Sequence, residues 1–449
     1  MDNQDTIKKT GAFIRNSATI KVLSIGLLVL VLLIPMSLIS SLMRERESRR
    51  DSVIREINEK WGNSQTITGP FFTVPFKFFY QDEEEKKEED KLKFHIRYLH
   101  ILPENIHISG QIDPQIRYRS LYEAVLYNTR IEINGDFTIS VPSQINVDPE
   151  NILWEKAIFS VGITDMGGIQ DDIIVKFDEK DYKVSPGLKT TDIASSGVQC
   201  VIGLSPTKGD CTFSLQLNLN GSEQIHFIPV GETTSVNLKS TWPSPSFDGS
   251  FLPVTREITD KGFSAAWNIL HLNRNFPQAW EGDQYKVNNS SFGLKLIIPA
   301  DIYQKSIRIS KYALMFIVFT FSAFFFSEII SKKRVHPIQY ILIGLAIILF
   351  YVLLLSISEH LSFDFAYILS AVAITTIITG YSKGILRNNY FTLTVFGILT
   401  ILYAYLYIVL QLEDYALLMG SIGLLVVLAT VMYITRKIDW YSLGKDQIQ

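Results

Sequence analysis

Five residues with side chains that could bind a metal or exchange protons lie in two short segments of the C-terminal third. Glu359, His360 and Asp364 belong to "SEHLSFD", and Glu413 and Asp414 belong to "QLEDY". Carboxylates and imidazole ligate metals and serve as general acids and bases. Each segment separates two apolar runs, so we expect all five side chains at one membrane surface, as a rim on a helix bundle.

Three interpretations of this rim stay open. It is a set of solvated loop ends, a metal or ligand site, or an acidic surface on which the domain at 43–310 docks. Exposed ion pairs contribute only about 0–1 kcal/mol each, so docking would set orientation more than stability. The stems of that domain supply the opposite charges: Arg44, Arg46, Lys305, Arg308 and Lys311.

The two cysteines of the chain, Cys200 and Cys211, enclose "CVIGLSPTKGDC". Ser-Pro and Lys-Gly favour a turn, which predicts a hairpin with the two sulfurs facing each other. A disulfide there would persist outside the cytoplasm and contribute at most about 2–3 kcal/mol. The alternative is a pair of buried free thiols.

Further chemistry has little support in the sequence. No nucleophile elbow, phosphate loop, zinc-protease or dinucleotide motif occurs, and we expect neither an enzyme nor a cofactor or metal. His95 and His100 are an odd number apart on one predicted strand, so they face opposite ways. The net charge of −3 does not favour nucleic acid as a partner.

Six apolar runs predict six transmembrane helices, one N-terminal and five C-terminal. The first ends in "SLMRERESRR" without a small-residue cleavage site, which favours a retained anchor over a signal peptide. Glu328, near the inner end of the second helix, is expected to pair or snorkel. The runs lie at 22–42, 312–330, 338–358, 365–380, 390–411 and 415–435.

Basic residues in the short connections predict the orientation. Lysine and arginine collect on the cytoplasmic side, and the two acidic connections contain neither. We therefore expect a plasma membrane protein with both termini in the cytoplasm and region 43–310 outside. The basic connecting residues are Lys332, Lys333, Arg334, Lys383, Arg387, Arg436 and Lys437.

The outside region alternates in the manner of β-strands. "FSLQLNLNG" places apolar side chains on one face, and "RIEINGDFTISV" carries an Asn-Gly pair that predicts a hairpin turn. We expect an all-β, sandwich-like domain, possibly of two lobes, with a helical stalk at 44–60. The acidic segment 81–91 is expected to be a solvated loop. The predicted domains are 1–21, 22–42, 43–310, 311–435 and 436–449.

Six stretches resemble the CreD family of cell envelope integrity inner membrane proteins. The resemblance covers nearly the whole chain, although the acidic insert and the cysteine pair do not look like family features. It implies an inner membrane protein linked to envelope integrity or stress, without an established enzymatic activity. The stretches are "WGNSQTITGPFFTVP", "SLYEAVLYNTRI", "WPSPSFDGSFLP", "HLNRNFPQ", "HPIQYILIGLAIILFYVLLLSISEH" and "LQLEDYALLMG".

Two of these stretches contain aromatic residues with two possible roles. Trp61, Trp242 and Phe247 either cover the hydrophobic core or contact a partner. We expect the protein to bind an unknown envelope component through its outside domain, in addition to the lipid bilayer. The alternative function is a transporter or flippase that moves a lipid or neutral solute through the helices. The oligomeric state stays open.

Overall fold

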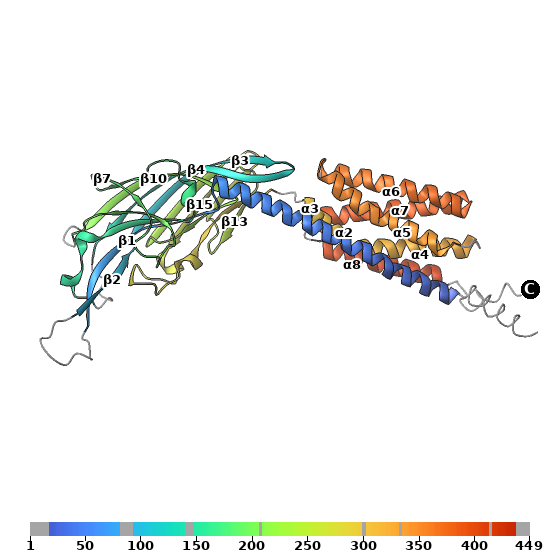
Figure 1. Ribbon diagram of the computed structural model, residues 1–449, viewed down its shortest axis with the longest axis horizontal. Helices are drawn as coiled ribbons and strands as arrows, with labels where there is room; N and C mark the ends of the chain where they lie inside the picture. The colour runs from blue at the N-terminus through green and yellow to red at the C-terminus, as the bar shows by residue number, and fades with distance from the viewer. Residues whose placement is uncertain are drawn as a thin grey trace, which may run out of the picture. The chain divides into compact units, whose positions relative to one another are not determined.

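The computed structural model describes residues 18–80, 93–140, 147–205, 209–298, 302–331, 335–412 and 415–436. The chain divides into two compact units, one of residues 1–50 and 300–449 and one of residues 51–299 (Figure 1). The predicted solvated loop at 81–91 lies outside the described residues.

The first unit is helical. Five of its helices are long and apolar enough to cross a membrane, and α8 has a shorter apolar stretch at Leu418–Thr430. This confirms the predicted fold class, a membrane protein with about six transmembrane helices. The helices are α2 (Ala18–Trp61), α3 (Ile302–Ser310), α4 (Ala313–Ser331), α5 (Pro337–Ser358), α6 (Phe363–Leu386), α7 (Asn389–Gln411) and α8 (Ala416–Thr435).

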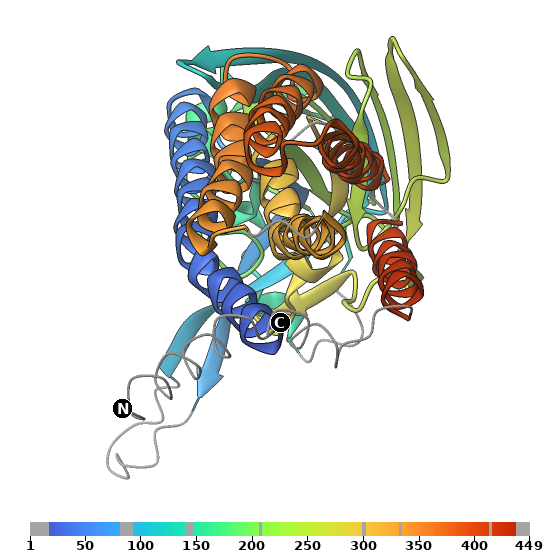
Figure 2. The same cartoon turned by 90° about the vertical axis from the view of Figure 1, so that its right-hand side faces the viewer.

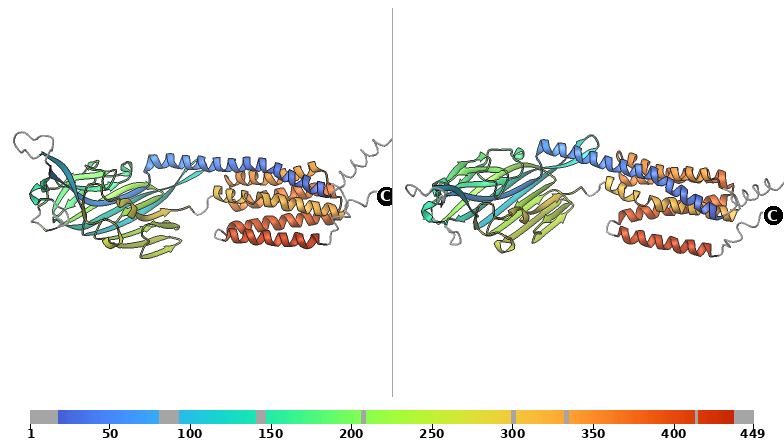
Figure 3. Two further views of the ribbon diagram at one scale, coloured as in Figure 1. Left: turned by 90° about the horizontal axis from the view of Figure 1, so that it is seen from below. Right: turned by 60° about the horizontal axis from the view of Figure 1, so that its bottom comes forward.

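The helices of this unit pack closely. Figures 2 and 3 show them running side by side; α5 contacts α4 and α6, and α7 contacts α4 and α6. A Cβ on Gly344 of α5 would come 2.2 Å from Leu32 Cδ1. The glycine therefore lets α2 approach α5 closely, as small residues do at helix interfaces in membranes.

The second unit is a β-sandwich of two sheets. One sheet contains β1 (Gln65–Tyr80), β2 (Lys93–Ile101), β5 (Ile158–Ile163), β8 (Ser185–Pro186), β9 (Gly197–Val201), β11 (Gln224–Ile228), β13 (Pro245–Gly249), β16 (Ala279–Glu281) and β17 (Phe292–Leu296). The other contains β3 (Asn105–Arg119), β4 (Tyr122–Thr138), β6 (Ile174–Phe177), β7 (Lys180–Lys183), β10 (Asp210–Ser222), β12 (Thr233–Ser240), β14 (Thr255–Thr259) and β15 (Gly262–Leu270).

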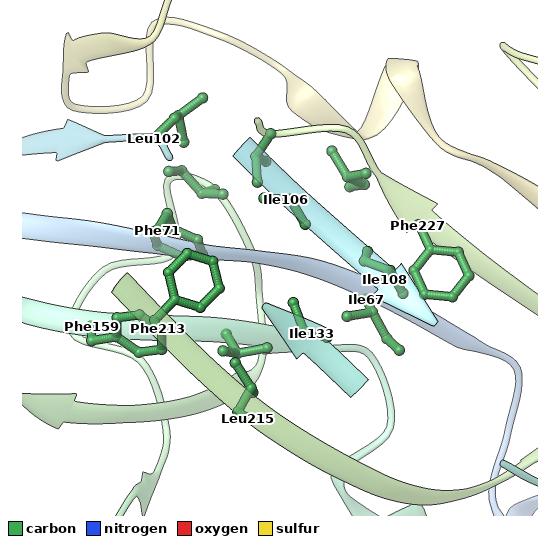
Figure 4. Close-up of a cluster of buried hydrophobic side chains, with 14 of the residues drawn as sticks. Ile67, Phe71, Leu102, Ile106, Ile108, Ile133, Phe159, Phe213, Leu215 and Phe227 are labelled. Atoms are coloured by element: carbon green, nitrogen blue, oxygen red, sulfur yellow. The ribbon is translucent and has the colours of Figure 1, made fainter. Parts of the chain in front are cut away.

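Alternating strands supply one continuous core between the sheets. The first sheet runs β13-β17-β11-β1-β5-β9-β8, and β2 pairs with β1 while β16 pairs with β2. The second runs β14-β15-β12-β3-β4-β10-β6-β7. Figure 4 shows Phe71 and Phe159 of the first sheet among Phe213, Ile108 and Ile133 of the second. The all-β sandwich is confirmed, and its buried side chains form one cluster, not two lobes.

The predicted turn at Asn134-Gly135 is wrong. Strand β4 continues through Gly135, which pairs with Ile106 of β3 and Phe213 of β10. A Cβ at this position would lie 1.9 Å from the carbonyl oxygen of Asn105. The glycine is therefore explained by close approach of a neighbouring backbone and not by a turn conformation.

Candidate functional site

Glu359 of the predicted rim lies at the C-terminal end of α5 and is nearly buried, with 11% of its side chain exposed. Its Oε1 accepts a hydrogen bond of 3.2 Å from the Tyr303 hydroxyl of α3. Nη1 of Arg46, on α2, lies 3.8 Å from the same oxygen. Arg50 places its guanidinium 5.5 Å from the Tyr303 ring centroid. Glu359 therefore links α2, α3 and α5 inside the helical unit.

Asp364 lies in the first turn of α6, where the helix dipole favours a carboxylate. Its Oδ1 accepts a 3.2 Å hydrogen bond from Gln411 at the end of α7. The backbone of His360 closes the turn after α5 through a 3.0 Å bond to Ile357. Glu413 and Asp414 lie outside the described residues. Within the described ranges, no three His, Cys, Asp or Glu side chains come together as a metal site.

A second carboxylate of the bundle, Glu328 of α4, is buried. It forms an ion pair with Lys21 of α2. Its oxygens also accept bonds from the Val335 N–H at 3.0 Å and the Tyr340 hydroxyl at 3.3 Å. The pairing expected from the sequence is present, with Lys21 as the partner. These contacts attach α2 to α4 and α5 at the opposite end of α5 from Glu359.

Trp61 ends α2, and its surroundings fix this helix end to the sandwich. The indole N–H donates to the Tyr127 carbonyl at 3.4 Å, and Arg117 lies 5.3 Å from the ring centroid. Asn63 donates its backbone and side-chain N–H groups to Asp165 at 2.7 and 2.8 Å. Partial burial acts to raise the pKa of Asp165, but the hydrogen bonds from Asn63 and Gly167 lower it overall.

Trp242 and Phe247 also make contacts inside the sandwich. The Trp242 indole donates to the carbonyls of Ser244 at 3.2 Å and Ile297 at 3.1 Å. The ring of Phe247 packs edge-on to Phe263 and Trp267, at centroid distances of 5.8 and 5.7 Å. These contacts give both residues a place in the packing of the domain, and a role of either in binding a partner stays a prediction.

The two cysteines do not face each other across a hairpin. Cys200 lies on β9 of one sheet and Cys211 on β10 of the other, because the chain crosses between sheets after β9. Both are buried free thiols in the structure. Burial raises the pKa of the Cys200 thiol to about 11, which lowers its reactivity. The predicted hairpin is therefore wrong, and disulfide formation stays a prediction.

A group of exposed aromatic residues that the sequence did not single out lies on the outer part of β1 and β2. Four apolar side chains on this two-stranded ribbon are exposed by 37–48%: Phe78, Phe79, Phe94 and Ile96. Lys77 lies 5.3 Å from the Phe94 ring centroid, and Arg97 lies 3.6 Å from that of Phe78. We call residues 77–80 and 93–97 the aromatic ribbon.

Comparison with known proteins gives the family. The family model described as "Inner membrane protein CreD" matches residues 17–441. This chain belongs to the CreD family. It is 32% identical over 434 residues to the inner membrane protein CreD of Escherichia coli K12, covering 94% of this chain and 93% of the relative. A crystal structure of a proposed nutrient-binding protein from Legionella pneumophila is 10% identical, covers 46% of this chain and 71% of its own, and has a TM-score of 0.22.

The CreD-like stretch at 271–278 has a structural explanation in Arg274. This guanidinium is buried and donates to the carbonyls of Phe276 at 2.5 Å and Val230 at 3.1 Å. Burial lowers the pKa of Arg274 to about 10, while the charge of Glu232 opposes this shift. Gln278 donates to the Pro103 carbonyl at 2.7 Å. The stretch holds three loops of the sandwich together.

Sequence reasoning missed the partners of two buried or half-buried polar groups of this CreD-family chain. His100 is fully buried and contacts Thr73 and Asp192. A hydrogen bond with Glu232, together with burial, raises the pKa of Glu104 to about 7. Neither had a sequence signal, because the residues that meet are at least 27 positions apart.

Proposed function

We propose that this CreD-family inner membrane protein supports the cell envelope by binding an envelope component through its β-sandwich. The family description supports the membrane location and the link to the envelope. The sandwich is a compact unit with its own apolar core, which suits a binding module carried by membrane helices.

The aromatic ribbon is the observation that carries this proposal. Lys77–Tyr80 pair only with Lys93–Ile96 among the described residues, because β1 pairs with β5 no further than Thr73 and β2 pairs with β16 from Leu99 onward. Figure 1 shows the two strands continuing together beyond their neighbours. A two-stranded ribbon alone is marginally stable in water.

Exposed aromatic side chains beside basic groups are typical of interaction sites. Tilted ring contacts such as that of Phe79 with Phe94, at 5.7 Å between centroids, cover only part of these rings. A partner that covered them would bury apolar area worth about 25 cal/mol per Å². The ribbon therefore favours a binding function over a purely structural one.

The orientation is part of the proposal. The distribution of lysine and arginine supports cytoplasmic termini and a sandwich on the outer side of the membrane. Only this orientation would give the sandwich access to an envelope component outside the cytoplasm. The ion pair between Glu359 and Arg46 supports a role of Glu359 in fixing α2, whose last residues belong to the sandwich unit.

Photo-crosslinking in living cells tests the proposal. A photoreactive residue placed at Phe79 or Ile96 should give one discrete adduct, identifiable by mass spectrometry. The matched control is Leu272, which is 80% exposed on the same unit but lies off the ribbon. Ribbon positions that crosslink no more than Leu272 would contradict binding at this surface.

A transporter or flippase is favoured by a different observation. Within the part of the chain that the structure describes, the buried hydroxyls of Tyr351, Tyr403 and Ser370 have no hydrogen-bond partner. Unpaired buried hydroxyls are costly, and a passing polar group would satisfy them. Movement of lipid or neutral solute in proteoliposomes, slowed by Tyr351→Phe but not by the exposed Tyr381→Phe, would support transport. Absence of movement with the unchanged protein would exclude it.

A further inference from the structure

The solvent face of the second sheet carries an unusually amide-rich set of side chains. They come from β15, β12, β3, β4 and β10, which are neighbours in that order. We call this set the polar grid: Asn268, Ala266, Ser264, Ser235, Asn237, Lys239, His107, Ser109, Gln111, Asp113, Asn128, Arg130, Glu132, Asn134, Ser214, Gln216 and Asn218.

Strand register aligns these side chains into rows across the sheet. In one row Lys239 pairs with Gln111, Gln111 with Arg130, and Arg130 with Asn218. Neighbouring strands lie about 4.8 Å apart, so hydrogen-bonding groups recur at a spacing similar to the width of one sugar ring. Such rows suit a chain molecule with many hydroxyl groups.

The grid is hollowed at two places. A depression of about 520 Å³ is lined by Gln111, Asp113, Asn128, Arg130 and Asn218, with Gln170 and Asp171 at its edge. A second one, of about 340 Å³, lies over β12, β14 and β15 beside Lys239 and Ser264. The pairing of Lys239 with Gln111 joins the two depressions, so a ligand longer than one ring could occupy both.

Internal hydrogen bonds orient the amides without using all their donors and acceptors. Asn218 donates to Asp171 at 2.7 Å, and Gln111 donates to Asp113 at 3.0 Å. Each amide offers two donors and an oxygen with two lone pairs, which leaves groups for a ligand. The guanidinium of Arg130, a residue that lines the larger depression, makes no ion pair or side-chain hydrogen bond with the described residues.

Charge balance points to an uncharged ligand. The two depressions are lined by three cations, Arg130, Lys239 and Arg256, and by three carboxylates, Asp113, Asp171 and Glu257, so these charges cancel. Within the rows of the grid the largest apolar side chain is that of Ala266, and the exposed Leu270 of β15 lies one row beyond them, so the rows themselves give no anchor for a lipid chain or an apolar peptide. Groups that both donate and accept fit hydroxyl and acetamido groups, which do the same.

We propose that the polar grid binds the glycan strand of the cell wall. This inference rests on the proposed function and adds to it a second binding surface, with a ligand class. The strand would lie across β12, β3, β4 and β10, with Gln111, Arg130 and Asn218 bonding to its hydroxyl and acetamido groups. The aromatic ribbon belongs to the other sheet, so the two surfaces can be tested separately.

Co-sedimentation of the full-length protein in detergent with purified cell-wall sacculi tests the inference. The unchanged protein should sediment with sacculi and be displaced by soluble oligomers of N-acetylglucosamine. The double variant Gln111→Ala, Asn218→Ala should bind about tenfold more weakly, equivalent to about 1.4 kcal/mol. Arg130→Gln should weaken binding independently. The control, Gln284→Ala with Asn289→Ala, removes two exposed amides outside the grid and should bind as before.

Unchanged melting temperatures would show that these surface variants fold. Failure of the unchanged protein to sediment, equal binding by the grid and control variants, or binding to lipopolysaccharide instead of sacculi would each overturn the inference. Ribbon crosslinks that persist in any of these cases would leave the proposed function standing. Loss of both the ribbon crosslinks and the binding to sacculi would overturn the inference and the proposed function together.

Discussion

His100 on β2 and Asp192 in the loop before β9 form a buried contact, with 2.8 Å between Nε2 of the imidazole and Oδ2 of the carboxylate. Nδ1 of the same ring lies 3.1 Å from the hydroxyl of Thr73 on β1. Burial lowers the pKa of His100, although the hydrogen bond and charge of Asp192 act to raise it. The contact ties β1 and β2 to the loop beside β9 with a neutral imidazole.

The first prediction follows from that neutral state. Because the folded pKa lies below the unfolded value, this group contributes stability that is present above about pH 6.5 and is lost as pH falls through the folded pKa. His100→Gln should therefore cost about 1–3 kcal/mol at pH 7.5, where it leaves Asp192 and Thr73 unpaired. The difference in the free energy of unfolding between the variant and the unchanged protein should shrink toward pH 5.

Denaturant unfolding followed by tryptophan fluorescence measures this difference. The control is His95→Gln, because the ring of His95 is exposed. A gap independent of pH would contradict the assignment.

The pair Glu104 and Glu232 should give the opposite dependence. Glu104 has a folded pKa of about 7, above its ordinary value of 4.5, so its ionisation weakens the fold as pH rises through 7. Glu104→Gln removes that ionisation. After a discount for solvent screening, we expect a gain of about 1 kcal/mol at pH 8 and no gain at pH 5. The same unfolding experiment applies, with the exposed Glu123→Gln as control. A gain in stability of equal size at both pH values would rule out a proton held between Glu104 and Glu232.

Thiol titration addresses Cys200 and Cys211. With a pKa near 11 for Cys200 and both side chains buried, neither thiol should react with a water-soluble disulfide reagent at pH 8 in the native protein. Both should react after unfolding without reductant, since the structure holds them as free thiols. If two thiols appear only after reduction, the disulfide predicted from the sequence forms. Rapid reaction in the native state would contradict the burial.

Sequence patterning predicted much of this fold, because membrane spans and strand alternation are local signals. Strand β1, at Gln65–Tyr80, and the helix that continues to Trp61 both lie where the apolar patterns place them. The hairpins at Asn134-Gly135 and at the cysteines failed for one reason. Turn residues there were read locally, whereas the position of Gly135 is set by Asn105, thirty residues earlier.

The candidate site was less accessible to sequence reasoning than the fold. The charges near the rim indicated which groups could pair, and Arg46 does lie near Glu359. The polar grid left no motif, because its rows join residues as distant as Gln111 and Lys239, which only the register of β3 with β12 aligns. Likewise the exposure of Phe78 and Phe94 depends on where β5 and β16 end.

Gly135→Ala tests the corrected position of that glycine. A Cβ would lie 1.9 Å from the Asn105 carbonyl oxygen and 2.8 Å from the Phe213 ring, so β3 or β10 must shift. We expect a loss of about 1–3 kcal/mol or more, as in overpacked cores. Gly203→Ala is the matched control, because its Cβ would meet its nearest neighbour at an ordinary 3.6 Å. Equal melting temperatures for the two variants would favour a turn at Gly135 after all.

Cysteine labelling tests the proposed orientation. In a variant with Cys200→Ser and Cys211→Ser, single cysteines are placed at Gln284 on the sandwich and at Lys383 at the end of α6, both exposed. Lysine and arginine resist translocation in short connections, so the sandwich should face outward and Lys383 inward. A membrane-impermeant maleimide should therefore label position 284 in cells with a permeabilised outer membrane, and position 383 only after lysis. The reverse pattern would place the sandwich in the cytoplasm, away from any cell-wall glycan, and would remove the basis for binding at both the ribbon and the grid.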